Sequence, residues 1–230
     1  MKEKDAPFKL CMDVLGRLHD AGALERIVII GSWCTYFYRK CGVLGGNIGT
    51  LRTDDIDFLV PRPFRGDLHV DIPGLVKDMG FIVVRGMTGA MQLEHADMKI
   101  EFLVPERGRG SDAPFNIDAL GVVAQQLRFL DFLLEETIFV KTGNIKIRLP
   151  LPERFGLHKI LISGRRHRPD KMAKDIEQGI DVLRSVIAAE KSEKVAEIFH
   201  SLPAKWRKAI LVGLKGTDDL LAILSKRSTP

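Results

Sequence analysis

Apolar and polar positions follow two different periods along the chain, and the change falls near residue 150. Before it, apolar residues gather in short runs rich in β-branched side chains, which predict buried strands. These runs are 27–30, 56–60, 81–85, 91–95, 98–104, 137–141 and 144–149. Apolar residues three and four positions apart predict helices between them. The helical segments are 8–23, a segment from Trp33, a weaker one at 67–79, and part of 116–135.

Beyond Pro150 and Pro152 the strand-like runs end. One set of apolar residues then has the spacing of a long amphipathic helix: Met172, Ile176, Ile180, Leu183 and Ile187. A second such helix follows over 195–202. We therefore predict the fold class α/β (α+β), with a mixed β-sheet domain over 1–150 and an all-helical C-terminal domain over 151–230.

The composition is that of a globular chain with a core of its own. The 230 residues are 45% hydrophobic and 28% charged, which argues against disorder over most of the length. No apolar run approaches the ~20 residues of a membrane-spanning helix, and the first residues lead into no apolar signal core. We expect a cytoplasmic protein without a membrane partner. Cys11, Cys34 and Cys41 form no CxxC pair, which excludes a disulfide framework or a zinc site as the organising principle.

The net charge of +5 is distributed unevenly. The whole excess of Lys and Arg lies in residues 151–230, whereas 1–150 is close to neutral. A basic region beside a mildly acidic one suggests phosphate-bearing ligands held between them. A solvated helical surface accounts for the same charges, and charge alone favours that interpretation.

Two hexapeptides are nearly identical, IDFLVP at 56–61 and IEFLVP at 100–105. Each places one carboxylate, Asp57 or Glu101, in a stretch otherwise suited to a buried strand. Alternate residues of a strand share a face, so Asp55 points to the same side as Asp57. If the two strands are neighbours in register, Asp57 lies across from Glu101 at a backbone spacing of about 5 Å.

Three carboxylates on one face of a sheet repel one another unless a cation lies between them. Oxygen ligands suit hard divalent ions, Mg²⁺ above all. The sequence therefore predicts a metal site at Asp55, Asp57 and Glu101, with Mn²⁺ as an alternative ion. Solvent-exposed positions, at a strand start for the aspartates and on an exposed face for Glu101, are the competing explanation. Asp54 faces away and is expected to be a cap or a solvated charge.

Gly31 and Ser32 follow an apolar strand and precede a helix. Glycine lets the backbone approach a phosphate closely, and a helix N-terminus directs N–H groups at an anion. By itself this signal is weak, because serine is also an ordinary helix N-cap. The glycine-rich run at 42–50 fits neither a Walker loop nor GxGxxG, so it is either a mobile loop beside the site or a plain connection.

Together these pieces resemble the nucleotidyltransferase superfamily of the DNA polymerase beta type. The resemblance is carried by Ile30-Gly31-Ser32, by Thr53 to Phe58 with its Asp-x-Asp, and by Ile100-Glu101-Phe102. It is closest to uncharacterised bacterial nucleotidyltransferase-fold proteins and looser to AbiEii-type toxins. The separation of Ser32 from Asp55 is longer than usual, and the third acid is Glu where Asp is common.

The resemblance implies that Asp55, Asp57 and Glu101 bind two Mg²⁺ ions and that Gly31 and Ser32 hold the triphosphate of an NTP. Metal ions neutralise charge on the phosphates as a hydroxyl attacks and pyrophosphate leaves. Glu101 is placed to help deprotonate that hydroxyl.

The basic residues between 154 and 174 offer a counter-charge for phosphates. Helical spacing puts Lys159, Ser163 and Arg166 on one face, and Lys171 is spaced to pair with Asp175. We predict that Lys159, or as second choice Lys174, reaches the nucleotide; a solvated cationic face is at least as well supported.

The remaining residue types point to no second chemistry. His158 and His167 are expected at the surface. The run Lys205-Trp206-Arg207-Lys208 is better explained by a helix burying its tryptophan than by nucleic-acid binding.

The expected function is transfer of a nucleoside monophosphate from an NTP to a hydroxyl of RNA, a protein or a small molecule such as an aminoglycoside, with the basic excess tilting slightly toward RNA. Two alternatives stay open. One is a toxin–antitoxin component of the same fold, for which growth arrest on expression, abolished by Asp57→Ala, is the discriminating observation. The other is a non-catalytic nucleotide-binding or interaction module, in which ATP with Mg²⁺ raises the melting temperature but no acceptor is labelled.

Overall fold

The computed structural model describes residues 6–46, 53–108 and 113–225. Contacts within the chain divide it into two compact units. Unit 1 comprises Met1–Phe37 and Gly49–Pro150, and unit 2 comprises Tyr38–Ile48 and Leu151–Pro230. The segment around residue 40 thus belongs with the C-terminal helices, although it lies far from them in sequence. No described helix is long and apolar enough to cross a membrane.

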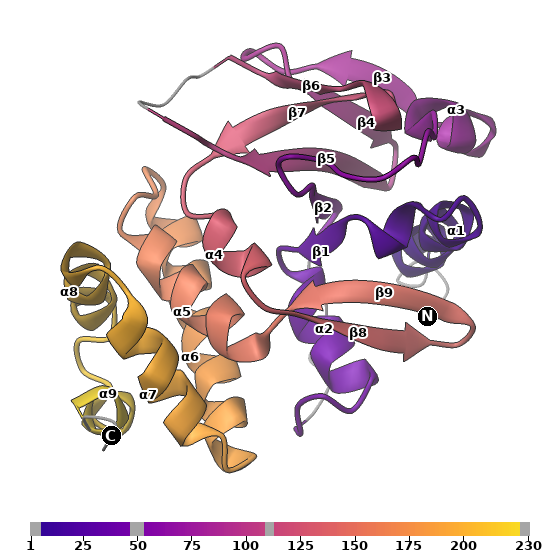
Figure 1. The fold of residues 1–230 in the computed structure, drawn as a ribbon. Helices are drawn as coiled ribbons and strands as arrows, with labels where there is room; N and C mark the ends of the chain where they lie inside the picture. Colours follow the sequence, from indigo (N-terminus) through magenta and orange to yellow (C-terminus); the bar gives the residue numbers. More distant parts are fainter. Residues whose placement is uncertain (1–5, 47–52, 109–112, 226–230) are drawn as a thin grey trace. The chain divides into compact units, whose positions relative to one another are not determined.

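Unit 1 is built on a mixed β-sheet with the strand order β1-β2-β5-β4-β3 (Figure 1). Its central strands β2 and β5 are parallel, whereas β1 and β4 run antiparallel to their neighbours. Strand β7 pairs with the second half of β5, and β6 pairs with β7. The strands are β1 (Val28–Ile30), β2 (Asp55–Leu59), β3 (Ile82–Arg85), β4 (Met91–His95), β5 (Met98–Pro105), β6 (Phe115–Ile117) and β7 (Val122–Leu127).

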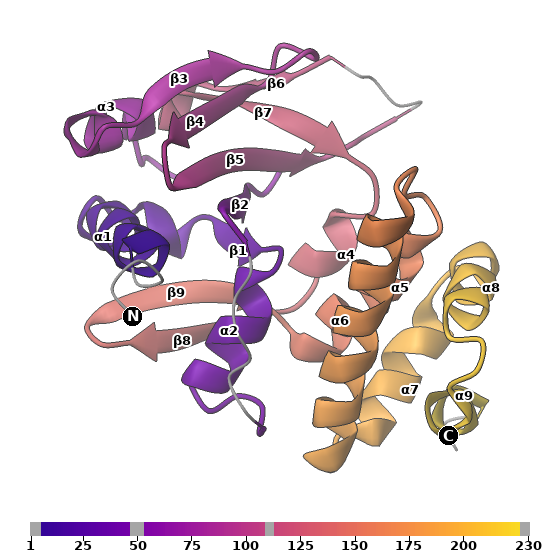
Figure 2. The same cartoon turned by 180° about the vertical axis from the view of Figure 1, so that it is seen from behind.

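The helices of unit 1 are short apart from α1. They are α1 (Ala6–Asp20), α2 (Trp33–Lys40, whose end belongs to unit 2), α3 (Ile72–Val76) and α4 (Asp131–Leu134), with single 3₁₀ turns at Ala23–Glu25, Lys77–Met79 and Asp118–Leu120. A separate hairpin of β8 (Thr137–Thr142) and β9 (Ile145–Pro150) packs against β1 and α1. In Figures 1 and 2, α1 lies between the large sheet and this hairpin. The mixed sheet and the hairpin confirm the predicted fold class for this part of the chain.

The expectation that part of 116–135 is helical is confirmed for a 3₁₀ turn at Asp118–Leu120 and for α4, but the strand between them was not predicted. Apolar residues at 120, 123, 124, 127 and 130 have helical spacing, but residues 122–127 form strand β7 and only 131–134 form an α-helix. The β-branched pair Val122-Val123 and the open edge of β5 explain the difference, because a strand there completes the backbone hydrogen bonds of the second half of β5.

Every regular element of unit 2 beyond residue 150 is a helix, among the residues described there. The helices are α5 (Pro152–Ser163), α6 (Pro169–Ala188), α7 (Ser192–Ser201), α8 (Ala204–Gly213) and α9 (Asp218–Ser225). Helices α5 and α6 lie side by side in Figures 1 and 2. They meet at two glycines: a Cβ on Gly179 would lie 2.9 Å from the carbonyl oxygen of Gly156 and 2.7 Å from Ile160 Cδ1. Such a close approach requires residues without a side chain.

This contact also corrects the buried face predicted for the long helix. The helix exists over Pro169–Ala188, but Met172 at the start of the predicted apolar stripe is exposed. Leu183 of the predicted stripe is buried as expected, but the other buried residues are Asp175, Gly179, Val182 and Val186. The face of the helix that packs on α5 contains a glycine and an aspartate, and hydrophobic periodicity does not predict such a face.

Candidate active site

The candidate site begins where β1 ends. Its last residue, Ile30, is followed by Gly31 with φ of +75°, a left-handed conformation that favours glycine, and then by Ser32 and helix α2. Within the first turn the amide of Cys34 donates to the carbonyl of Gly31 at 3.2 Å, and the Thr35 hydroxyl donates to the carbonyl of Ser32 at 2.8 Å. The predicted sequence of strand, Gly-Ser and helix is therefore found.

Asp57 of β2 lies directly against this turn. Its backbone is paired with Ile30, the neighbour of Gly31. A Cβ placed on Gly31 would overlap the Oδ2 atom of Asp57. Two independent features, the left-handed φ and the carboxylate contact, thus require glycine at position 31.

The register of the parallel strands β2 and β5 places Asp57 opposite Glu101, as the repeated hexapeptides predict. The next position of β2 on the same face, Asp55, lies opposite Lys99. Strand β4 continues both rows, because Gln92 pairs with Glu101 and Glu94 pairs with Lys99. One face of the sheet therefore carries the three predicted acids together with Lys99, Gln92 and Glu94.

The polar contacts of Glu101 with the described residues both involve its Oε1 atom. The side-chain amide of Gln92 donates a hydrogen bond to Oε1 at 2.6 Å. The ammonium group of Lys99 lies 3.6 Å from the same oxygen. The Glu101 side chain is 26% exposed, whereas Asp55 is exposed and Asp57 is half-buried. The sequence reasoning missed Gln92 and Lys99, although both lie in the strand runs predicted at 91–95 and 98–104.

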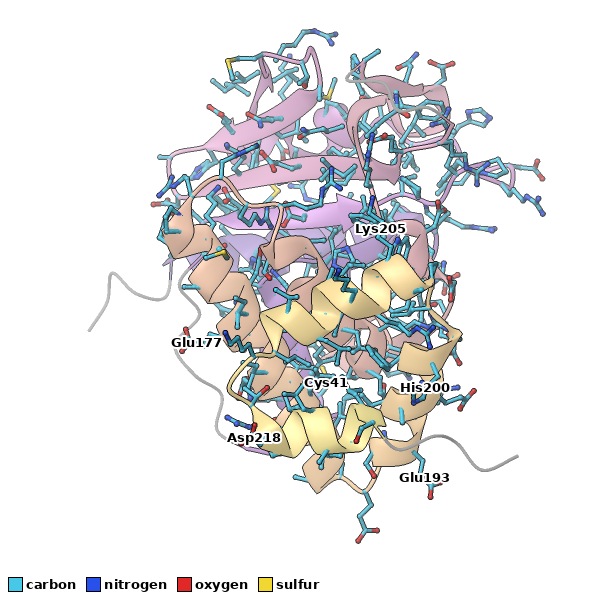
Figure 3. The ribbon with its side chains drawn as sticks, turned by 90° about the vertical axis from the view of Figure 1, so that its left-hand side faces the viewer. Cys41, Glu177, Glu193, His200, Lys205 and Asp218 are labelled. Atoms are coloured by element: carbon cyan, nitrogen blue, oxygen red, sulfur yellow. The ribbon has the colours of Figure 1, made fainter. Side chains whose placement is uncertain are left out.

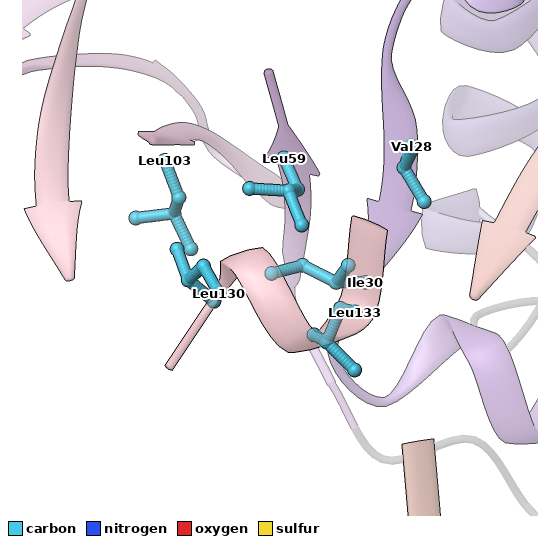
Figure 4. Packing of buried hydrophobic residues seen from close by; sticks show 6 residues of the cluster. All are labelled: Val28, Ile30, Leu59, Leu103, Leu130 and Leu133. Atoms are coloured by element: carbon cyan, nitrogen blue, oxygen red, sulfur yellow. The ribbon is translucent and has the colours of Figure 1, made fainter. Parts of the chain in front are cut away.

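An apolar cluster continues the same face of the sheet toward the other end of the strands (Figure 4). One leucine just before helix α4 and one within it pack on side chains of β1, β2 and β5. The cluster consists of Val28, Ile30, Leu59, Leu103, Leu130 and Leu133. Ile30 is the direct partner of Asp57 in the register, and Leu59 follows Asp57 by two positions on the same face. This buried cluster therefore fixes the strands that carry the carboxylates.

The basic residues predicted to bind phosphates belong to unit 2. The ammonium group of Lys159 donates to Oδ1 of Asp175 at 2.7 Å, and Nε of Arg166 donates to Oδ2 at 2.6 Å. Lys159 is only 8% exposed and Asp175 only 4%. Asp175 thus pairs with Lys159 and Arg166, which corrects the expected pair with Lys171. Lys174 is exposed. The phosphate contact of Lys159 and Lys174 stays a prediction, while the contacts described give Lys159 a structural role within unit 2.

His158 corrects a second expectation, since it is 5% exposed rather than at the surface, whereas His167 is exposed as expected. Burial, followed by the nearby positive charge of Lys159, lowers the pKa of His158 to about 3. The imidazole is therefore neutral at physiological pH.

The basic run in α8 is divided between surface and interior. Lys205 lies at the surface of unit 2, as Figure 3 shows, and Lys208 is exposed as well. Trp206 and Arg207 are half-buried. The tryptophan is thus partly covered in its helix. Of the glycine-rich run at 42–50, residues 47–50 lie outside the described ranges, and 42–46 form neither helix nor strand.

The donor atoms at the sheet face suit a hard divalent cation, since Asp55, Asp57 and Glu101 offer only carboxylate oxygens. Among the residues that the structure describes, however, no three His, Cys, Asp or Glu side chains are gathered closely enough to form a metal-binding group. A metal ligated by Oε1 of Glu101 competes with the contacts of Gln92 and Lys99. The type of donor atom thus fits a divalent ion although the three carboxylates are not gathered, and Oε2 of Glu101 makes no hydrogen bond or ion pair with a described residue.

Comparison with known families assigns the family of the chain. A nucleotidyltransferase family model matches residues 9–203, well over half of the chain. The chain belongs to this nucleotidyltransferase family, which confirms the resemblance drawn from Gly31-Ser32, Asp-x-Asp and Glu101.

Among solved structures, an antigenic nucleotidyltransferase-like protein from Paracoccidioides brasiliensis is similar in fold, with a TM-score of 0.52 at 15% identity, covering 96% of this chain and 94% of that one. The protein ANT(2'')-Ia, solved in complex with adenylyl-2''-tobramycin, matches with a TM-score of 0.44 at 15% identity, covering 89% of this chain and 96% of that one. These likenesses concern the fold alone. No curated protein matches the sequence.

Proposed function

We propose that the chain transfers a nucleoside monophosphate from an NTP to an acceptor hydroxyl, using the face of the sheet that carries Asp55, Asp57 and Glu101. The observation that carries the proposal is the pairing of Asp57 with Glu101 on neighbouring parallel strands, with the Asp57 carboxylate against Gly31. Membership of a nucleotidyltransferase family supports the same reaction.

Each residue has a distinct role in this proposal. The left-handed turn at Gly31 brings the backbone close to the phosphates, and Ser32 offers a hydroxyl at the start of α2. Asp55, Asp57 and Glu101 hold Mg²⁺, or Mn²⁺ in its place. When bound, such an ion neutralises charge on the triphosphate and at the phosphorus under attack. Glu101, which lies between Asp57 and Gln92 in the register of the sheet, accepts the proton of the acceptor hydroxyl.

The acceptor is proposed only as a class, a hydroxyl of RNA, of a protein or of a small molecule, and the reaction is proposed to take place in the cytoplasm. The uneven basic charge of the chain favours RNA slightly. Lys159 and Lys174 are retained as predicted phosphate contacts. Lys159→Ala with unchanged nucleotide affinity contradicts this part of the proposal.

The test incubates the purified chain with each α-labelled NTP and Mg²⁺ against total RNA, total protein and a panel of aminoglycosides. Asp57→Asn and Glu101→Gln are expected to reduce labelling at least ~100-fold, because each removes an anionic metal ligand. Asp54→Asn is the matched control: this exposed residue lies just before β2 and its side chain is expected on the other side. Equal labelling by Asp54→Asn and Asp57→Asn contradicts the assignment of the site.

One observation favours a second candidate, a nucleotide-binding module without transfer. Oε1 of Glu101 is engaged by Gln92 and Lys99, and the described residues include no gathered group of three metal-ligating side chains. For such a module, ATP with Mg²⁺ raises the melting temperature of the chain, while none of the acceptors is labelled. Labelling that depends on Asp57 excludes this candidate.

A further inference from the structure

We infer that Gln92 and Lys99 control Glu101 in opposite directions: Gln92 is a positioning residue that aims one oxygen of Glu101 at a divalent cation, and Lys99 competes with that cation. This inference rests on the proposed function, since it assigns how its third carboxylate is held. Neither residue belongs to the motifs that define the site.

The first step is the division of labour between the two oxygens of Glu101. The Gln92 amide donates to Oε1 at 2.6 Å, and the Lys99 ammonium lies 3.6 Å from Oε1 as well. In the part of the chain that the structure describes, Oε2 has no such contact. A carboxylate held at one oxygen has a fixed rotation about its last bond, so the second oxygen points in one direction.

The second step is the rigidity of the element that carries Gln92. Gln92 is the direct antiparallel partner of Glu101, and the β4–β5 ladder continues through Leu93, Glu94 and His95. Both side chains are half-buried. A donor on a neighbouring strand in register is positioned by backbone hydrogen bonds and does not depend on a loop. Partners of this kind orient metal ligands, and their removal typically costs about 10–100-fold in metal affinity or activity.

The third step concerns charge. Lys99 precedes Glu101 by two residues on the same face and lies opposite Asp55 in the register. Its ammonium group, 3.6 Å from Oε1, offsets part of the negative charge of Glu101. A divalent ion entering this face is repelled by that ammonium group, and Lys99 loses its partner when the ion takes Glu101. Removing the positive charge of Lys99 therefore favours ion binding.

The experiment measures Mn²⁺ binding to the full chain by electron paramagnetic resonance, without nucleotide, and NMP transfer in parallel. Gln92→Met keeps the length of the side chain but removes the donor. It is expected to weaken Mn²⁺ binding about tenfold and to lower kcat while leaving KM for the NTP nearly unchanged. Lys99→Met is expected to tighten Mn²⁺ binding several-fold. General damage to the fold weakens binding in both variants, so effects of opposite sign are the signature of the inferred roles.

Gln125→Met is the matched control. Gln125 is the same residue type, is half-buried, and lies on the other neighbour of β5 opposite Leu103, on the same face as Glu101. Its variant is expected to bind Mn²⁺ like the wild type. Gln92→Asn, which retains a donor on a shorter side chain, is expected to recover part of the lost affinity. Equal behaviour of Gln92→Met and Gln125→Met overturns the role of Gln92, and unchanged or weaker binding in Lys99→Met overturns the role of Lys99.

A double-mutant cycle tests the Gln92–Glu101 bond without any metal. Gln92→Met, Glu101→Leu and the double variant are compared by melting temperature, and the double variant is expected to lose less than the sum of the single losses. Additive losses overturn the bond. If Mn²⁺ binding and the cycle behave as expected but no acceptor is labelled, the proposed function fails while this inference stands. If the wild type labels an acceptor but the variants match Gln125→Met, this inference fails alone.

Discussion

Unit 1 and unit 2 each bring acidic and basic side chains together, but with opposite balances. In unit 2, the single carboxylate of Asp175 accepts from two cations, one on each oxygen, and it is 4% exposed. In unit 1, Asp55, Asp57 and Glu101 share one face with Lys99, and the Glu101 side chain is 26% exposed. The first cluster is buried and its one carboxylate has a cation on each oxygen, whereas the described part of the second carries more carboxylates than lysines and is more exposed.

This difference separates a structural ion cluster from a candidate ligand site. A buried charge is tolerated when its own neighbours neutralise it, and such a cluster needs no ligand for charge balance. An exposed surplus of carboxylates is stabilised by a cation from outside. In sequence the two sets look alike, because composition counts charges and does not pair them. The following predictions test this distinction.

The largest effect is expected from Asp175→Ala. Removing the carboxylate leaves the ammonium group of Lys159, 8% exposed, without its partner. Breaking a buried ion pair on one side costs about 3–5 kcal/mol of unfolding free energy. Urea denaturation measures the loss. Asp170→Ala is the control, since Asp170 pairs with Arg168 but is exposed, and we expect it to be indistinguishable from the wild type.

A double substitution sharpens this prediction. Replacing both members, with Lys159→Met and Asp175→Leu, is expected to recover most of the stability that Asp175→Ala loses, because no buried charge is then unpaired. Arg166 loses its partner too, but its side chain is 40% exposed and water can solvate it. A double variant as unstable as Asp175→Ala argues that the cluster contributes more than charge balance.

The next effect concerns acid. Burial lowers the pKa of His158 to about 3, from an ordinary value near 6.5. Between these values the unfolded chain binds a proton that the folded chain does not, so stability falls as pH decreases through that window. The loss is up to about 1.4 kcal/mol per pH unit. Denaturation at pH 6.5 and pH 4.5 is expected to differ less in His158→Leu than in the wild type. The exposed His167→Leu serves as control.

Asp175 adds to the same acid sensitivity at lower pH. Burial raises its pKa, but Lys159 and Arg166 outweigh burial, so the pKa lies below its ordinary value. Its contribution to stability is complete above the unfolded pKa and is lost as pH falls through the folded one. A wild type whose stability is flat from pH 6.5 downward contradicts both assignments.

Sequence patterns predicted the shared faces of the strands of unit 1 better than the buried faces of the helices of unit 2. On β2 and β5, period-two alternation fixes which residues share a face, and the repeated hexapeptide sets the register, so the placement of Asp57 opposite Glu101 follows. On α5 and α6, the face is decided by the close contact of Gly156 with Gly179 and by the Lys159–Asp175 pair. These are tertiary contacts, which apolar periodicity does not encode.

The same limit explains what was missed in the candidate site. Strand β7 forms because β5 has an open edge, and local spacing favoured helix there. The contact of Gln92 with Glu101 depends on the register and side-chain geometry of a strand pair, of which the sequence predicted only the two strands. The burial of His158 depends on packing around α5 as a whole. The roles of Asp55, Asp57, Glu101, Gly31 and Ser32 stay predictions.

A smaller effect is expected from Gly31→Ala, which perturbs the contact of the backbone with the Asp57 carboxylate. Gly31 and Gly42 have nearly the same left-handed φ, +75° and +71°. A Cβ at Gly42 meets no atom within 4 Å, whereas at Gly31 it overlaps Oδ2 of Asp57. Gly42→Ala therefore measures backbone strain alone, and Gly31→Ala is expected to cost about 1 kcal/mol more in denaturation. Gly31→Ala is also expected to reduce Mn²⁺ affinity. Equal costs, or equal Mn²⁺ affinity, contradict the contact.

The smallest effect is expected from Arg184→Ala, which breaks an exposed ion pair of unit 2. Arg184 donates to both oxygens of Asp219, at 2.8 Å and 3.1 Å, lengths close to the 2.7 Å of the Lys159–Asp175 bond. The side chains of Arg184 and Asp219, however, are 55% and 53% exposed. Water and salt screen such a pair, so we expect a melting temperature within error of the wild type, with any difference shrinking as salt is added. If Arg184→Ala instead destabilises the chain as strongly as Asp175→Ala, the contribution of an ion pair to stability depends on bond length rather than on burial. Exposure then no longer distinguishes the Asp175 cluster of unit 2 from the carboxylates on the sheet face of unit 1.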